Sequence, residues 1–231
     1  CIEDEPAIHA AAYNGNITIL QLLLDHKAEI DNPGLYGYGI TALAHAAQFG
    51  RVEAVKLLLS RGAKVDGNFG KIEMAYTPLM FACNKGQLEA VQILLAAGAS
   101  INVINCHGGT ALRAAVYGRH FNVIKLLISH GANPNGFLYP YQYNYDRDHN
   151  PLMSAAYSGQ VEVVKILLAA GACKLVTDKQ GRTPLDLARE HANYNYQSEE
   201  QKKNYQIIIN ELSRKEIAHH QFQGVVFKYK E

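Results

Sequence analysis

Apolar residues recur along the chain in five similar runs that are separated by polar and glycine-rich segments. The runs occupy residues 19–24, 54–59, 90–95, 123–128 and 163–168. A glycine–alanine step follows each run after two residues, except in the first copy, where Lys27 and Ala28 stand in its place. The alanines of this step are Ala28, Ala63, Ala99, Ala132 and Ala172, at spacings of 35, 36, 33 and 40 residues. Self-similarity at such a period predicts an array of repeated supersecondary units, none of which can bury its apolar face alone.

A second, shorter helix is predicted before each apolar run. The residue before its first turn is one whose side chain can accept a hydrogen bond from the first helical N–H groups, namely Thr41, Thr77, Thr110, Asn150 and Thr183. Proline follows at the first helical position in three copies, at Pro78, Pro151 and Pro184, where a missing N–H does little harm. These helices are rich in alanine, so a neighbouring helix can approach closely. Glycine then turns the chain toward the apolar helix, at Gly15, Gly50, Gly86 and Gly159.

The fourth and sixth copies depart from this pattern. In the fourth, Gly118 comes one place early and Arg119 stands at the usual glycine position, so the sequence leaves the geometry of that turn open. In the sixth, Ala192 stands where glycine would turn the chain, and a polar stretch precedes the apolar run 207–209. We expect the sixth copy to be a capping repeat with a terminal helix over about 199–217.

The repeated pattern resembles the ankyrin repeat, most literally in "YTPLMFACNKGQLEAVQILLAAGASIN" at 76–102. The resemblance covers about residues 5–195 and implies an all-α fold, a solenoid of stacked helix–turn–helix units with projecting finger loops. It also implies a structural role for His9, in hydrogen bonding between repeats. We expect an array over 1–195, a capping helix over 196–217 and a tail over 218–231. The repeats are expected at about 5–31, 40–66, 76–102, 109–135, 149–175 and 181–212.

Three of the predicted finger loops are enlarged, and these three are also the aromatic ones. The regular finger spans eight positions, as from Asn102 to Thr110, whereas the enlarged fingers span ten, eleven and fifteen positions. Their aromatic residues are Tyr36 and Tyr38 in the first, Phe69 and Tyr76 in the second, and Phe137, Tyr139, Tyr141, Tyr143 and Tyr145 in the third. Alternate spacing in the third would place its rings on one face of an extended segment. That face either packs against neighbouring fingers or contacts a partner.

A second candidate surface follows from the resemblance, which implies that the last residues of each first helix line a concave side and touch partners. The residues at these positions are Tyr13 and Asn14, Gln48 and Phe49, Asn84 and Lys85, Tyr117, and Tyr157 and Ser158, of which Tyr13, Phe49, Asn84, Lys85, Tyr117 and Tyr157 are the candidate binding residues. Tyrosine suits a binding surface because it combines apolar area, a polar tip and little rotamer entropy. The alternative is that Tyr13, Tyr117 and Tyr157 pack beneath their own fingers.

Composition and charge narrow the class of partner. The 231 residues carry 22 Lys and Arg against 21 Asp and Glu, a formal charge of +1, which disfavours nucleic acid or an anionic membrane as the main partner. Arg119 and Arg147 near tyrosine-rich loops could stack single-stranded nucleic acid, but the near-neutral total disfavours this as well. The four cysteines form no CxxC pair, which indicates reduced thiols in the cytoplasm or nucleus. The absence of an initiator methionine indicates a fragment.

Candidate chemistry adds no catalytic centre to this picture. Cys83 occupies a small-residue position of a helix and is predicted to be a core residue. Cys106 and His107 lie side by side at a finger tip, where adjacency in sequence does not provide the geometry of a base and a nucleophile. His219 and His220 lack partners at metal-site spacing. We therefore expect no cofactor, no metal and no catalysis.

The sequence thus predicts a monomeric interaction module that binds another protein or a peptide, with no small-molecule substrate and no membrane association. The alternative is that the array targets a larger enzyme to its substrates, or belongs to a secreted bacterial effector that acts in the host cytosol.

Overall fold

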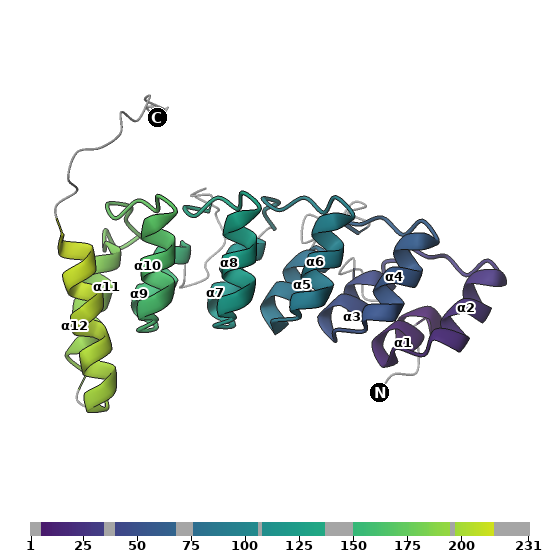
Figure 1. Ribbon diagram of the computed structural model, residues 1–231, viewed down its shortest axis with the longest axis horizontal. Helices are drawn as coiled ribbons and strands as arrows, with labels where there is room; N and C mark the ends of the chain where they lie inside the picture. Colours follow the sequence, from purple (N-terminus) through teal and green to yellow (C-terminus); the bar gives the residue numbers. More distant parts are fainter. Residues whose placement is uncertain are drawn as a thin grey trace, which may run out of the picture.

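The computed structural model describes residues 6–34, 40–67, 76–105, 108–136, 150–194 and 197–214. In these ranges the chain forms twelve α-helices in six antiparallel pairs, which stack side by side as an elongated array (Figure 1). The first helices of the pairs are α1 (Ala7–Asn14), α3 (Ala42–Gln48), α5 (Pro78–Lys85), α7 (Ala111–Tyr117), α9 (Pro151–Tyr157) and α11 (Pro184–Ala192). The second helices are α2 (Ile17–Asp25), α4 (Val52–Ser60), α6 (Leu88–Ala96), α8 (Phe121–Ser129), α10 (Val161–Ala169) and α12 (Glu199–Ser213). The predicted all-α solenoid is confirmed.

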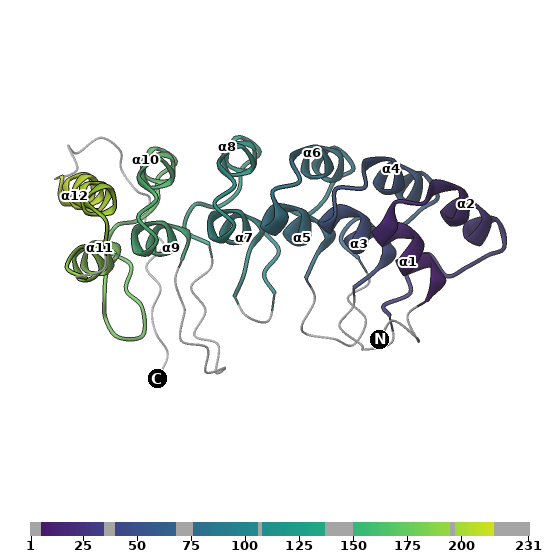
Figure 2. The same cartoon turned by 90° about the horizontal axis from the view of Figure 1, so that it is seen from below.

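The two sets of helices form two layers (Figure 2). We call the row of first helices the inner layer and the row of second helices the outer layer. Each connection between repeats runs from an outer helix to the next inner helix, and it projects beyond the inner layer, away from the outer one, as the described connection between α10 and α11 shows (Figure 2). The core lies between the layers, where alanines such as Ala46 and Ala115 face leucines such as Leu58 and Leu127, all fully buried. Small residues in one layer allow the large residues of the other to pack closely.

The helix starts lie where the sequence predicts them. The side chains of Thr41, Thr77, Thr110, Asn150 and Thr183 each accept a hydrogen bond from the backbone N–H three residues later. Such a cap stabilises a helix by about 1 kcal/mol. These five caps fix the starting points of five of the six inner helices, α1 being the exception, and hence the positions of their last residues, where most of the candidate binding positions lie.

The sequence did not decide the geometry of the turn after α7. In the structure, this turn is formed by two neighbouring residues, Gly118 and Arg119. Gly118 has an ordinary helical conformation with φ −73°, and Arg119 takes the left-handed conformation with φ 59°. Gly15, Gly50, Gly86 and Gly159 fill that left-handed place in other repeats. A side chain at position 118 would lie only 2.6 Å from the carbonyl oxygen of Asn84. Glycine therefore stands one place early because the preceding repeat approaches closely there.

A row of hydrogen bonds ties the ends of α1, α3, α5 and α7 to the next repeat. In each bond, a side chain at the start of an outer helix donates to a carbonyl oxygen at the end of the inner helix of the preceding repeat. The pairs are Arg51 Nε to Tyr13 at 3.0 Å, Gln87 Nε2 to Gln48 at 3.3 Å, His120 Nε2 to Asn84 at 2.9 Å and Gln160 Nε2 to Val116 at 3.1 Å. Because a carbonyl only accepts, the Nε2 atom of His120 carries the proton.

A second row connects the closing residues of the repeats. The side chains of Asp31, Asp66, Asn102 and Asn135 accept from the backbone N–H groups of Lys64, Ser100, Asn133 and Cys173, at 2.7–3.0 Å. Each donor follows the alanine of a glycine–alanine step. His9 forms a hydrogen bond through Nε2 with the carbonyl oxygen of Asn32 at 2.9 Å, in the connection to the second repeat.

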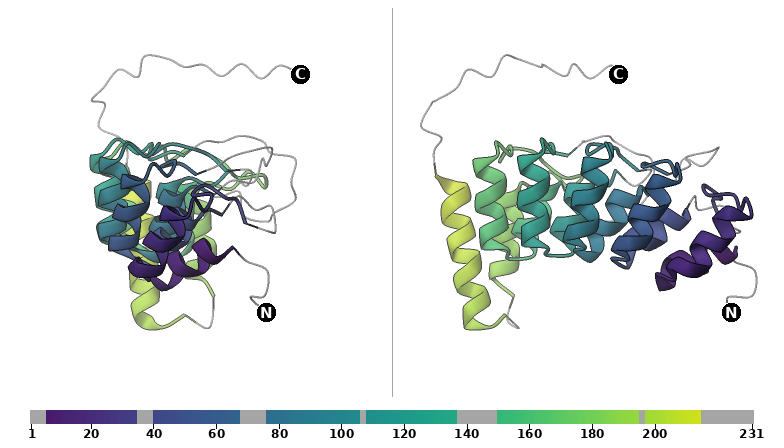
Figure 3. Two further views of the ribbon diagram at one scale, coloured as in Figure 1. Left: turned by 90° about the vertical axis from the view of Figure 1, so that its right-hand side faces the viewer. Right: turned by 45° about the vertical axis from the view of Figure 1, so that its right-hand side comes forward.

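The sixth pair closes the C-terminal end of the array, where the longer helix α12 covers α10 and α11 (Figure 3). Its buried face consists of Tyr205, Ile208 and Leu212. The helix ends at Ser213, earlier than the predicted range of 199–217, and Arg214 is already extended with φ −59° and ψ 126°. In the part of the chain that the structure describes, Leu212 is the last buried residue.

Candidate partner-binding groove

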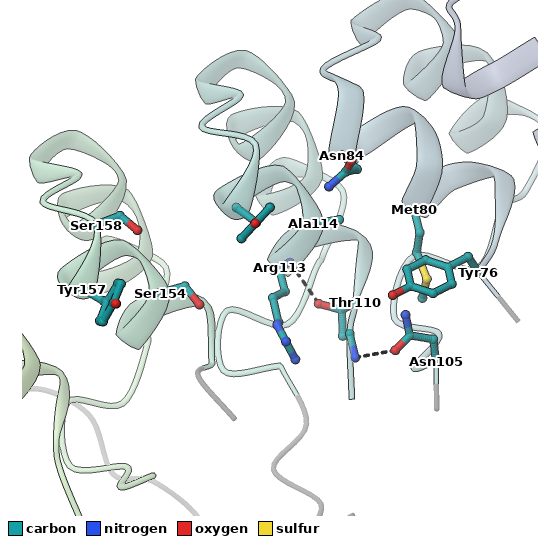
Figure 4. A pocket seen from close by; sticks show the side chains of 12 residues that line it. Tyr76, Met80, Asn84, Asn105, Thr110, Arg113, Ala114, Ser154, Tyr157 and Ser158 are labelled. Atoms are coloured by element: carbon teal, nitrogen blue, oxygen red, sulfur yellow. Dashed lines mark hydrogen bonds between the residues drawn. The ribbon is translucent and has the colours of Figure 1, made fainter. Parts of the chain in front are cut away.

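A groove runs across the inner layer between α5, α7 and α9, on the side from which the connections project (Figure 4). It encloses about 300 Å³. The larger residues that line it include Tyr76, Asn84, Arg113, Tyr117, Tyr157 and Ser158, and the small residues Ala114 and Ser154 line it as well. The inner helices make room for it because α7 packs less extensively against α9 than against α5.

Tyr117 is the most exposed aromatic residue of the groove. It is the last residue of α7, and 70% of its surface is accessible to solvent. The helix end beneath it is held in place, because Gln160 binds the carbonyl oxygen of Val116. A tyrosine ring on a fixed helix end is a rigid apolar surface with a polar tip, which is what a protein interface uses as an anchor.

Tyr157 is the equivalent residue of α9 and is partly buried. Its ring lies 4.0 Å, between centroids, from the imidazole of His191 on α11. Its carbonyl oxygen accepts a hydrogen bond from the Tyr205 hydroxyl of α12 at 2.8 Å. Tyr157 therefore packs against the capping repeat while one side of it lines the groove.

The polar part of the groove is built on the connection between α6 and α7. The buried side chain of Asn105 accepts from the backbone N–H of Gly109 at 2.8 Å, and Thr110 caps α7 through the N–H of Arg113 at 3.2 Å (Figure 4). The side chain of Arg113 extends from α7 toward the connections (Figure 4). These bonds fix the first turn of α7, so the base of the Arg113 side chain has a defined position.

Not all the predicted site residues meet in this groove. Asn84, Tyr117 and Tyr157 line it, and Lys85 lies exposed beside it as the last residue of α5. Tyr13 and Phe49 form a separate aromatic pair nearer the N-terminus, with ring centroids 4.3 Å apart. The remaining predicted residues, Tyr36, Tyr38, Phe69, Tyr139, Tyr141, Tyr143 and Tyr145, lie outside the described residues.

Sequence reasoning did not assign Tyr76, Met80 or Arg113 to the site. Tyr76 was recognisable as a finger aromatic, and its ring lies 5.5 Å from that of Phe81 on α5. Arg113 carries a charge in a helix whose other residues are mostly alanine and apolar, and this contrast could have identified it. Met80 could not be distinguished from an ordinary core residue, since it is 2% exposed.

Cys83, on α5, is a core residue, as predicted. It is fully buried, and burial raises the pKa of its thiol well above the usual range because the thiolate would lose its hydration. It is thus held in the protonated, weakly nucleophilic form. In the part of the chain that the structure describes, no three His, Cys, Asp or Glu residues are placed to hold a metal ion. None of the helices described is both long and apolar enough to cross a membrane.

Comparisons with known proteins agree with the repeat architecture. The chain is 32% identical over 163 residues to the ankyrin repeat and KH domain-containing protein mask-1 of Caenorhabditis elegans, covering 70% of this chain but 6% of that protein. It is 34% identical over 187 residues to the B-cell lymphoma 3 protein homolog of Mus musculus, covering 80% and 32%. It is 35% identical over 199 residues to palmitoyltransferase ZDHHC13 of the same species, covering 83% and 29%. The chain thus spans less than a third of each of these three proteins.

The family model for ankyrin repeats in three copies matches three times, at residues 2–69, 66–137 and 137–197. These matches cover most of the chain and include every inner helix of the array. The chain belongs to the ankyrin repeat family.

Proposed function

We propose that this chain is a non-catalytic interaction module that holds a segment of another protein in the groove between α5, α7 and α9. Ankyrin repeats generally mediate protein–protein interaction and are typically non-catalytic. The observation that carries the proposal is Tyr117, a large aromatic residue that is 70% exposed on a helix end fixed by the next repeat. Exposed aromatic residues on rigid supports are typical anchors of protein interfaces.

The size of the groove favours a peptide segment over a separate small molecule. A volume of about 300 Å³ is at the lower limit of small-molecule pockets, and it is sufficient for one or two side chains. The rings of Tyr76, Tyr117 and Tyr157 line it, and Tyr13 and Phe49 provide a further aromatic surface on the inner layer. An extended segment could contact both surfaces. A monomeric state and a cytoplasmic or nuclear location remain predictions.

The enzymes among the relatives do not change this proposal. The palmitoyltransferase is matched over 29% of its length, so its activity does not transfer to this chain. An array that recruits substrates for a larger enzyme would use the same groove, and the groove variants below would impair it equally.

The proposal is tested by placing a photo-crosslinking amino acid, p-benzoylphenylalanine, at position 117, and by placing it at position 22 as a control. Leu22 is 57% exposed on α2, at the far end of the outer layer. We expect crosslinks to a defined protein from position 117 and not from position 22. That protein is then purified, and its affinity is measured by calorimetry for the wild-type chain, Tyr117→Ala and Leu22→Ala.

Truncating an interface anchor weakens binding by at least about tenfold. We expect this loss for Tyr117→Ala and an unchanged affinity for Leu22→Ala, with equal thermal midpoints. Equal affinities of Tyr117→Ala and the wild-type chain would show that the partner binds elsewhere.

A further inference from the structure

Five residues occupy the same place near the ends of the inner helices α1, α3, α5, α7 and α9. Each stands two positions before the residue of its repeat that takes the left-handed conformation, namely Gly15, Gly50, Gly86, Arg119 or Gly159. Because these inner helices pack side by side, the five residues form a row across the inner layer (Figure 2). In chain order the row consists of Tyr13, Gln48, Asn84, Tyr117 and Tyr157. It therefore carries two carboxamides between aromatic residues.

The main chain at both carboxamides is held in place by the next repeat. The carbonyl oxygen of Gln48 accepts from Nε2 of Gln87 at 3.3 Å, and that of Asn84 accepts from Nε2 of His120 at 2.9 Å. Both residues are partly exposed, and neither side-chain amide is hydrogen-bonded within the part of the chain that the structure describes. Each amide group thus extends from a fixed helix end, where it can bind a partner without ordering the backbone first.

A carboxamide is suited to the main chain of a peptide. It presents N–H donors and a carbonyl acceptor side by side, which complements the N–H and C=O groups of an extended segment. The main-chain groups of a helix already bind each other, so a helix would offer the two amides no main-chain partners. Main-chain bonds supply affinity whatever the peptide sequence, and specificity then comes from surfaces for particular side chains.

Two aromatic surfaces flank the pair of carboxamides. On the N-terminal side, Tyr13 is 44% exposed, and the centroid of its ring lies 4.3 Å from that of Phe49. On the C-terminal side, Asn84 itself lines the groove that contains Tyr117 and Tyr157 (Figure 4). Packed helices lie about 8–10 Å apart and an extended segment rises about 3.3 Å per residue, so one repeat corresponds to about three residues. Two apolar side chains about six to eight positions apart in one segment would therefore reach both surfaces.

We propose that the inner layer binds its partner segment in an extended conformation, with the side-chain amides of Gln48 and Asn84 hydrogen-bonded to the main chain and two apolar side chains on the aromatic surfaces. This inference rests on the proposed function and specifies the conformation and the pattern of the bound segment. A nucleic acid strand, whose bases also pair with carboxamides, is disfavoured by the formal charge of +1.

The test uses a displayed library of random dodecapeptides, selected on the wild-type chain and on Tyr117→Ala. We expect the peptides enriched on the wild-type chain to carry two aromatic or aliphatic residues about six to eight positions apart. One such peptide is then synthesised in variants in which single amide groups are replaced by esters, so that one N–H donor is removed at a time. The protein variants are Gln48→Ala, Asn84→Ala and the matched control Gln92→Ala, which removes an exposed amide of α6 in the same repeat as Asn84.

Fluorescence anisotropy gives the affinity of each pair of protein and peptide. Loss of one neutral hydrogen bond weakens binding by about threefold to tenfold, so we expect such a loss for Gln48→Ala and for Asn84→Ala. Gln92→Ala should bind as the wild-type chain does, and all variants should keep the thermal midpoint of the wild-type chain. An ester at the peptide residue that faces Asn84 should weaken binding to the wild-type chain and should cost nothing further on Asn84→Ala, since both changes remove the same bond.

The outcomes separate this inference from the proposed function. Wild-type affinity of Gln48→Ala or Asn84→Ala would overturn the inference, and so would ester losses that are equal on the wild-type chain and on Asn84→Ala. A helical peptide would give the second result, because esters weaken its internal hydrogen bonds on either chain. Peptides that depend on Tyr117 but on neither amide would leave the interaction module intact. If no selected peptide depends on Tyr117, both proposals are wrong.

Discussion

Tyr117 and Tyr157 occupy the same position in neighbouring repeats, yet their surroundings differ. Each is the last residue of an inner helix. Tyr117 is 70% exposed, whereas the ring of Tyr157 packs at 4.0 Å on His191 and its carbonyl oxygen is bound by Tyr205. Both line one groove. The equivalence of sequence position therefore does not imply equivalence of role.

The difference arises from the next repeat along the array. After α7 comes an ordinary repeat, which holds the helix end through the Gln160 side chain and leaves the Tyr117 ring uncovered. After α9 comes the capping repeat, in which the His191 ring packs against the Tyr157 ring and the Tyr205 hydroxyl donates to the Tyr157 carbonyl oxygen. One side of the groove is thus built by the cap, and the other presents the exposed anchor. Stability and binding should therefore respond to different residues.

The largest expected effect is on stability at α9. Tyr157→Ala removes a partly buried ring and its contact with His191, so we expect the free energy of unfolding to fall by about 2 kcal/mol. Tyr117→Ala truncates an exposed ring, and we expect a change within about 0.5 kcal/mol. Urea denaturation followed by circular dichroism measures both. Equal losses for the two variants would mean that the cap does not use Tyr157 as a packing residue.

A smaller effect on stability is expected from the Tyr205 hydroxyl group, which donates a hydrogen bond to the carbonyl oxygen at the end of α9. Tyr205→Phe removes the donor at 2.8 Å from the Tyr157 carbonyl and leaves that acceptor without this bond, which should lower stability by about 1 kcal/mol. Tyr117→Phe is the matched control, since it removes a hydroxyl from an exposed ring, and its stability should not change. The urea midpoints of the two variants provide the comparison, and a midpoint for Tyr205→Phe equal to that of the wild-type chain would show that this bond is not stabilising.

The repeat architecture could be predicted from the sequence because its determinants are local. A capping residue such as Thr77 and the proline at position 78 act on the helical turn that directly follows them. The apolar residues of each run likewise lie within one helix, so each of these signals can be recognised in a single segment. The place of Gly118 could not be explained in this way. It depends on the carbonyl oxygen of Asn84, which belongs to the preceding repeat.

The candidate site could be predicted only in part, because its arrangement depends on contacts between repeats. The row of side chains that fixes the inner helix ends changes type along the array, from Arg51 to Gln87 to His120, so no sequence pattern marks it. Tyr205 performs the same task for α9 from 48 residues away. Which tyrosine is covered and which is exposed follows from these contacts and not from residue type.

The smallest expected effect is a dependence on pH that belongs to the capped side alone. Burial among Tyr157, Tyr194 and Tyr205 lowers the pKa of His191 below its usual value of 6.5; the charge of Glu190 opposes this shift and that of Arg182 adds to it. Below pH 6.5 the unfolded chain therefore takes up a proton that the folded chain resists, so stability is lost as pH falls from neutrality through that value. His191→Phe keeps a ring against Tyr157 but cannot take up a proton. We expect the urea midpoint of the wild-type chain to decrease more between pH 7.5 and about 5.5 than that of His191→Phe, and an identical decrease in both would place the titrating group elsewhere.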